Sequence, residues 1–170
     1  MIDSKSEAQK SSLSIDVIIK EGRDLVPKDF STFSSNSKGS SDPYVRLSID
    51  GVTYGSTRVQ KKTLKPKWNY QVPIIELNSE KASQILNGGM GVLKFEVIDS
   101  DMFKDDPMGV VNVPLQPFLT KEKDLSLVKG EWYKVEKGEP DDKSYCEDAS
   151  GELLLKIKVT RFDANSAILY

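Results

Sequence analysis

Histidine is absent from this 170-residue sequence, and cysteine occurs once, at Cys146. Without histidine the chain has no Ser-His-Asp or Cys-His nucleophile system, no imidazole general base and no histidine metal ligand. A single cysteine also excludes a disulfide framework and a cysteine-rich zinc cluster. These absences narrow the chemistry that the chain can support.

Long apolar runs are also missing, since none approaches the ~18–20 residues that cross a bilayer. The polar start MIDSKSEAQK does not resemble a signal peptide. The 24 basic and 26 acidic side chains give a net charge of −2, which argues against the strongly basic surface of generic nucleic-acid binding. Together with the lack of an Asn-X-Ser/Thr sequon, these features favour an intracellular globular protein.

What the sequence does contain is a series of short alternating segments. Apolar residues at every second position, as from Leu13 to Ile19, are typical of strands with one buried face. A helix is expected over 79–87, before Gly88-Gly89. We predict an all-β fold: an eight-stranded antiparallel β-sandwich with this one short helix between strands four and five. The eight strands are expected at 13–19, 44–49, 52–62, 68–77, 92–98, 108–113, 132–135 and 151–161.

The expected organisation is one domain over residues 11–163, with a polar N-terminal tail at 1–10 and a C-terminal tail at 164–170. Trp68 and Trp132 are expected to pack on the sheets. Cys146 is expected to be an exposed, inert thiol in a polar loop.

The densest charge follows the strand predicted at 92–98, where Asp99, Asp101, Asp105 and Asp106 fall within eight residues. Such carboxylates repel one another unless something neutralises them. Residues i and i+2 of an extended chain point the same way, so Asp99 and Asp101 can converge. Clustered carboxylates can supply the six to eight oxygen ligands that Ca²⁺ requires. The alternative is a solvated acidic turn.

A second acidic pair strengthens the metal hypothesis. Asp29 and Asp42 lie on either side of the serine-rich loop that follows the first strand. Because a sandwich gathers its loops at two ends, this loop and the one carrying Asp99 can share an end.

Five segments, in this order, resemble the C2 domain family: LVPKD at 25–29, SDPYV at 41–45, TLKPKWN at 63–69, VIDSD at 97–101 and DPMG at 106–109. The resemblance implies an eight-stranded sandwich whose loops at one end bind Ca²⁺ and then anionic phospholipid. The strand beginning GELLL at Gly151 comes last, which resembles the circularly permuted type II arrangement of the family.

The same resemblance implies which residues form the site. The calcium ligands would be Asp29, Asp42, Asp99, Asp101 and Asp106, with Asp105 as a rival to Asp106 because the third loop is about one residue short. Apolar loop residues that would enter the membrane are Met102, Phe103, Phe30 and Phe33, unless they pack locally. Basic residues that would face anionic lipid are Arg46, Arg58, Lys61 and Lys62, unless they form only a solvated strand face.

The predicted function is calcium-dependent binding to anionic phospholipid membranes, with phosphatidylserine as the main lipid and phosphoinositides as a further candidate. The protein would be cytoplasmic and recruited to membranes as calcium rises. An enzyme is not expected: Asp99-X-Asp101 resembles a phosphatase nucleophile motif only superficially, since Phe103 stands where Thr or Val would follow. The alternative function is a calcium-independent protein–protein interaction module.

Overall fold

The computed structural model describes residues 11–30, 39–88, 91–119 and 128–163. The two predicted tails and Phe33 therefore lie outside the described residues. The domain boundaries stay a prediction.

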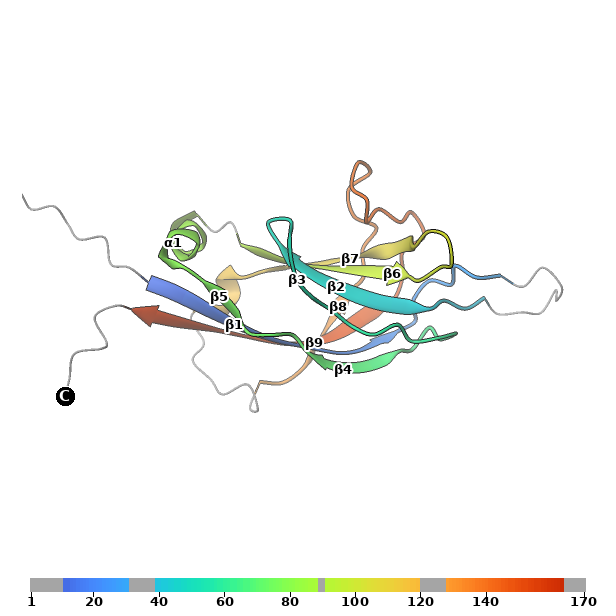
Figure 1. Cartoon of the computed structure of the whole chain (residues 1–170), viewed down its shortest axis with the longest axis horizontal. Coiled ribbons are helices and arrows are strands. Elements are labelled where there is room, and N and C mark those ends of the chain that lie inside the picture. Colours follow the sequence, from blue (N-terminus) through green and yellow to red (C-terminus); the bar gives the residue numbers. More distant parts are fainter. Residues whose placement is uncertain (1–10, 31–38, 89–90, 120–127, 164–170) are drawn as a thin grey trace, which may run out of the picture.

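Two antiparallel sheets pack face to face (Figure 1). One sheet has the strand order β4-β1-β9-β8, with β5 also pairing with β1, and the other has the order β3-β2-β6-β7. The first sheet contains β1 (Ser11–Arg23), β4 (Lys67–Gln71), β5 (Ile75–Leu77), β8 (Glu131–Lys134) and β9 (Glu152–Asp163). The second contains β2 (Pro43–Ile49), β3 (Val52–Ser56), β6 (Val92–Asp99) and β7 (Asp106–Pro114). The helices are α1 (Ser79–Gly88) and the short 3-10 helix η1 (Gln116–Phe118).

The core lies between the sheets, as the alternation predicts. Along β1 and β6 every second side chain is buried, including Ile15 and Phe95, which have no exposed surface. Burial of a large aliphatic or aromatic side chain stabilises the fold by about 1.5–3 kcal/mol. The predicted all-β sandwich with one α-helix is confirmed for the described part of the chain.

Two predicted strands are interrupted in the structure, and β1 is longer than the predicted 13–19. The segment 68–77 is divided, so that the described chain has nine strands. Pro73 interrupts it because proline has no N–H to donate to β1. The segment 52–62 has a bulge at Tyr54 against β2. It leaves regular pairing after Ser56, where Thr57 bonds to Val45 through both its backbone and its hydroxyl.

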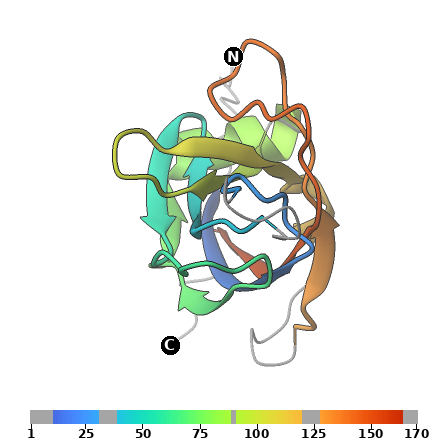
Figure 2. The same cartoon turned by 90° about the vertical axis from the view of Figure 1, so that its right-hand side faces the viewer.

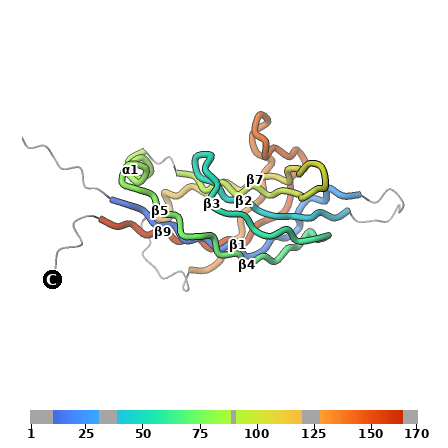
Figure 3. Tube along the Cα trace, viewed as in Figure 1, coloured from blue at the N-terminus to red at the C-terminus, as the bar shows by residue number. Residues whose placement is uncertain are grey.

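The segment between β8 and β9 corrects the expectation for Cys146. This segment, residues 136–148, is drawn in orange beside β7 in Figures 1 and 3. Its turns bring Cys146 back into the core, where the residue is 3% exposed, and Cys146 N–H donates to the carbonyl of Lys137 at 2.8 Å. The predicted exposed thiol is wrong because local polarity does not reveal a turn that folds inward.

The loop after β1 and the loop after β6 lie at one end of the sandwich, on the right of Figure 1 and facing the viewer in Figure 2. The α-helix lies at the other end. The expectation that Asp29, Asp42 and Asp99 share an end agrees with this arrangement. The assignment to the type II arrangement stays a prediction.

Candidate metal centre

Backbone pairing at the base of the serine-rich loop positions Asp29. Asp29 and Ser40 form an isolated antiparallel bridge, with N–H to carbonyl distances of 2.8 and 2.9 Å. Ser41 is fully buried below this bridge, where its hydroxyl donates to the carbonyl of Val26 and accepts from the N–H of Lys28. These bonds fix the base of the loop and, with it, the backbone of Asp29.

A second connection joins β2 to β6 at the same end. Pro43 is paired with Asp99, and the N–H of Asp42 donates to Oδ1 of Asp99 at 2.5 Å. In return, the N–H of Ser100 donates to the carbonyl of Asp42 at 3.1 Å. The bond from Asp42 fixes the orientation of the Asp99 carboxylate, and the Asp99 side chain is completely buried.

Asp29, Asp99 and Asp101 bring carboxylate oxygens within 4.8 Å of one another. One calcium with ligands at about 2.3–2.6 Å holds oxygens on opposite sides at most ~5 Å apart. Moreover, Oδ2 of Asp99 is buried and accepts no hydrogen bond, which is costly for a charged oxygen. The spacing, the hard oxygen donors and this unpartnered atom fit a calcium ion.

The pKa values of two carboxyls show the strain of this arrangement. Burial raises the pKa of Asp99, and the negative charges of Asp29, Asp101 and Asp42 raise it further, against one lowering hydrogen bond. The pKa of Asp101 is also raised, by desolvation first and then by the neighbouring carboxylates. Both groups are thus held among like charges.

Asp42 is bonded differently from these three carboxylates. Its Oδ1 accepts from the backbone N–H of Lys62 at 2.7 Å, and its Oδ2 accepts from the Lys61 ammonium at 2.8 Å. Lys62 reaches this position in a left-handed conformation, with φ of 53°, which is strained for a residue with a side chain. The Lys61 hydrogen bond lowers the pKa of Asp42, and the same bond raises the pKa of Lys61.

The two rival aspartates of the third loop also differ. Asp105 uses both carboxylate oxygens: Oδ2 accepts from the Tyr44 hydroxyl at 2.8 Å and Oδ1 from the N–H of Asp101 at 3.1 Å. Asp106 is exposed at the start of β7, in register with Asp99, and its charge contributes to the raised pKa of Asp101.

Large apolar side chains project from the same end. Met102 is 90% exposed, Phe103 96% and Phe30 67%. These side chains are exposed, so they are not packed under the loops. Phe33 lies outside the described residues.

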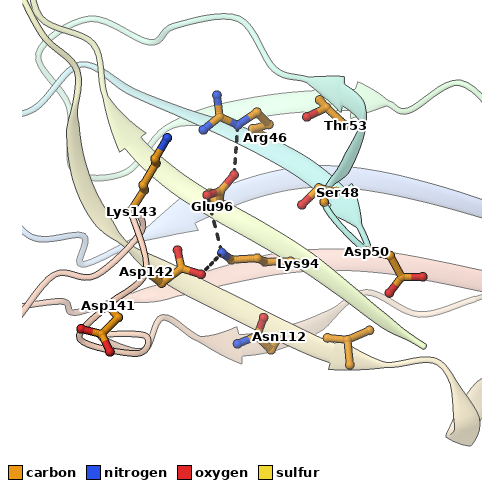
Figure 4. Close-up of a pocket in the computed structure, with 12 residues that line it drawn as sticks. Arg46, Ser48, Asp50, Thr53, Lys94, Glu96, Asn112, Asp141, Asp142 and Lys143 are labelled. Atoms are coloured by element: carbon orange, nitrogen blue, oxygen red, sulfur yellow. Dashed lines mark hydrogen bonds and ion pairs between the residues drawn. The ribbon is translucent and has the colours of Figure 1, made fainter. Parts of the chain in front are cut away.

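The predicted basic residues divide into two groups. Arg58 and Lys62 are exposed, whereas Lys61 is paired with Asp42 at 2.8 Å and Arg46 with Glu96 at 3.0 Å. Arg46 belongs to a pocket of about 700 Å³ on the outer face of the second sheet (Figure 4).

That pocket holds a network which the sequence did not reveal. Glu96 contacts both Arg46 and Lys94, and Lys94 reaches Asp142 at 2.7 Å (Figure 4). Asp142 also accepts from the N–H and the hydroxyl of Ser144. The alternation of strand 92–98 placed Lys94 and Glu96 on one face, but nothing in the sequence placed Asp142 beside them.

The chain is a two-layer β-sandwich domain with three converging carboxylates at one end. Comparison with known families identifies which family of β-sandwich domains it belongs to. The family model for the C2 domain matches residues 13–135, so this chain belongs to the C2 domain family.

The relatives agree with this assignment. Synaptotagmin-3 of Arabidopsis thaliana is 31% identical over 136 residues, covering 76% of this chain and 22% of that protein. Among solved structures, a single C2 domain of plant extended synaptotagmin 1 has a TM-score of 0.62 at 20% identity, covering 88% of this chain and 95% of that one. The calcium-bound pair of C2 domains of extended synaptotagmin 2 has a TM-score of 0.60 at 24% identity, covering 89% of this chain and 46% of that one. These structural likenesses show the fold.

The chain spans 8–22% of the length of the first curated relatives that it matches. No helix in the described parts of the structure is long and apolar enough to cross a membrane.

Proposed function

We propose that this domain binds anionic phospholipid membranes in a calcium-dependent manner, through the end that carries Asp29, Asp99 and Asp101. The observation that carries the proposal is the buried, unpartnered Oδ2 of Asp99 within a group of carboxylates spaced for one divalent ion. A domain that folded around these charges without a cation would retain an unrelieved electrostatic cost.

Each residue has a distinct role in this proposal. Asp29, Asp99 and Asp101 hold the ion between the loops, while Asp42 and Asp106 complete the set. We favour Asp106 over Asp105 because both oxygens of Asp105 are already engaged by Tyr44 and Asp101. A calcium ion held by these residues would supply the positive charge that attracts an anionic lipid oxygen.

The membrane contact follows from charge and exposure. Five carboxylates carry a formal charge of about −5, which repels an anionic bilayer until it is neutralised. Met102, Phe103 and Phe30 then lie where apolar side chains can enter the boundary between headgroups and acyl chains. Arg58 and Lys62 add general attraction to anionic lipid, worth about 1 kcal/mol per basic residue near the surface. We propose that the domain acts by binding and not by catalysis.

The test is sedimentation with vesicles of phosphatidylserine and phosphatidylcholine, with calcium or with chelator. Wild-type protein should sediment only with calcium, and Asp101→Asn should abolish the effect. Asp141→Asn is the matched control, because it removes the same charge from an exposed residue beside the outer-face pocket. Equal sedimentation with calcium and with chelator would contradict the proposal and favour a calcium-independent interaction module.

A further inference from the structure

Lys61 places a positive charge against one of the proposed calcium ligands. Its Nζ lies 2.8 Å from Oδ2 of Asp42. The Lys61 side chain is 71% exposed and the Asp42 side chain is 16% exposed, so the ammonium approaches the carboxylate from the solvent side. Lys61 therefore occupies the solvent-facing oxygen of Asp42.

The remaining bonds of Asp42 show what this pairing does. Oδ1 is taken by the backbone N–H of Lys62 at 2.7 Å, so neither oxygen is without a partner. Asp42 is also not one of the carboxylates that converge within 4.8 Å, which are Asp29, Asp99 and Asp101. The only one of these two bonds that can break without moving the backbone is the bond to Lys61.

We propose that Lys61 is an internal counter-ion that competes with calcium for Asp42 and is released when calcium binds. This inference rests on the proposed function. Asp42 exchanges the Lys61 ammonium for the metal ion, and the freed ammonium then projects at the membrane-facing end. Calcium affinity in solution is lowered by the exchange, while affinity for anionic lipid in the presence of calcium is raised by the released charge.

The two consequences have opposite signs, which makes Lys61→Met an informative variant. Removing the competing ammonium should tighten calcium binding in solution. The gain should be only about 3–5-fold, because an exposed ion pair contributes little free energy. Vesicle binding at saturating calcium should weaken by about 5-fold, the contribution of one lysine near an anionic surface. Because Lys61 is largely exposed, the variant should keep the wild-type melting temperature without calcium.

Two further variants separate the ion pair from general charge. Lys62→Met removes the same charge one residue away but keeps the backbone N–H that bonds to Asp42, so calcium affinity should change by less than about 2-fold. Lys61→Arg keeps a cation within reach of Asp42 and should therefore keep the wild-type calcium affinity. Calcium titration calorimetry measures all four proteins, and the NMR signal of the Lys61 side chain should move towards that of a solvated lysine as calcium is added.

The outcomes distinguish this inference from the proposed function. If wild type binds calcium and Lys61→Met and Lys62→Met change the affinity equally, the counter-ion role is overturned and the proposed function stands. A Lys61 signal that does not respond to bound calcium would overturn it as well. If neither wild type nor any variant binds calcium, the proposed function fails and the counter-ion role fails with it.

Discussion

Acidic side chains cluster in two regions of this domain, and the surroundings shift their pKa values in opposite directions. At the loop end that carries Asp29, Asp99 and Asp101, the last two of these face other carboxylates, and their pKa values are raised. On the outer face of the second sheet, Asp142 lies against Lys94 and accepts two bonds from Ser144, and its pKa is lowered. Carboxylates that the fold satisfies stabilise it, whereas carboxylates left unsatisfied are available for a ligand.

The same contrast separates a structural pocket from a binding site. The outer pocket is hollow and polar, but four of the charged side chains that line it, Arg46, Glu96, Lys94 and Asp142, form a connected network. The loop end that carries Asp29, Asp99 and Asp101 is only a rim of loops, yet it holds a buried oxygen with no partner at Asp99. Unmet bonding capacity, more than cavity volume, indicates where a ligand belongs.

The largest expected difference between the two regions is in membrane binding. Phe103→Ala should weaken calcium-dependent vesicle binding by about 10–100-fold, since burying one large apolar side chain contributes about 1.5–3 kcal/mol. Val92 is a matched control because it is exposed but lines the outer-face pocket. Val92→Ala should leave vesicle binding unchanged, and an equal loss for both variants would show that the membrane does not meet the loop end that carries Phe103 specifically.

The next effect is on thermal stability with calcium. At a concentration 100 times the dissociation constant, a ligand of the native state stabilises it by about 2.7 kcal/mol, which for a chain of this size raises the melting temperature by about 5–10 °C. Asp99→Asn should remove this shift, and Asp142→Asn should retain it. Differential scanning fluorimetry with calcium and with chelator measures both, and an unchanged wild-type melting temperature would count against the metal site.

Without calcium the same two variants should differ in sign. Asp142→Asn removes a carboxylate that Lys94 and Ser144 satisfy, and should lower the free energy of unfolding by about 1 kcal/mol. Asp99→Asn keeps an oxygen to accept from the N–H of Asp42 but removes a buried negative charge, and should raise the stability. Urea unfolding in chelator tests this contrast, which would be lost if both variants were destabilised.

The smallest effect is in how stability depends on pH. The lowered pKa of Asp142 means that its contribution is present above the usual value near 3.8 and is lost as pH falls through the lowered value. The raised pKa of Asp99 has the reverse effect: its destabilising charge appears as pH rises from 3.8 through the raised value. In chelator, the gap between wild type and Asp99→Asn should widen with rising pH, and that for Asp142→Asn should narrow with falling pH.

Much of the fold followed from local pattern. Apolar residues at every second position predicted the strands, as in β1 and β6, because successive side chains on a strand point to opposite faces. The break at Pro73 has a local cause, the missing N–H, and was still missed because the flanking residues continue an apolar run. The inward turn that buries Cys146 has no local signature, since it depends on contacts with the core.

Part of the candidate site could also be predicted from local pattern, and part depended on tertiary contacts. Spacing along the chain placed Asp99 and Asp101 together, and the shared end of a sandwich made Asp29 a neighbour. The pairing of Asp42 with Lys61 was not predicted, because it depends on where the chain turns after leaving β3. The ligand roles of all the aspartates and the lipid roles of the apolar and basic residues stay predictions.

The approximate positions of most strands and the charged residues can be read from the sequence, since both properties belong to short segments of chain. Which charges are satisfied depends on the folded arrangement. That outcome depends on partners distant in the sequence: Asp142 lies 48 residues from Lys94, and Asp42 lies 57 residues from Asp99. A carboxylate becomes a stabilising contact or a ligand according to what the fold places next to it.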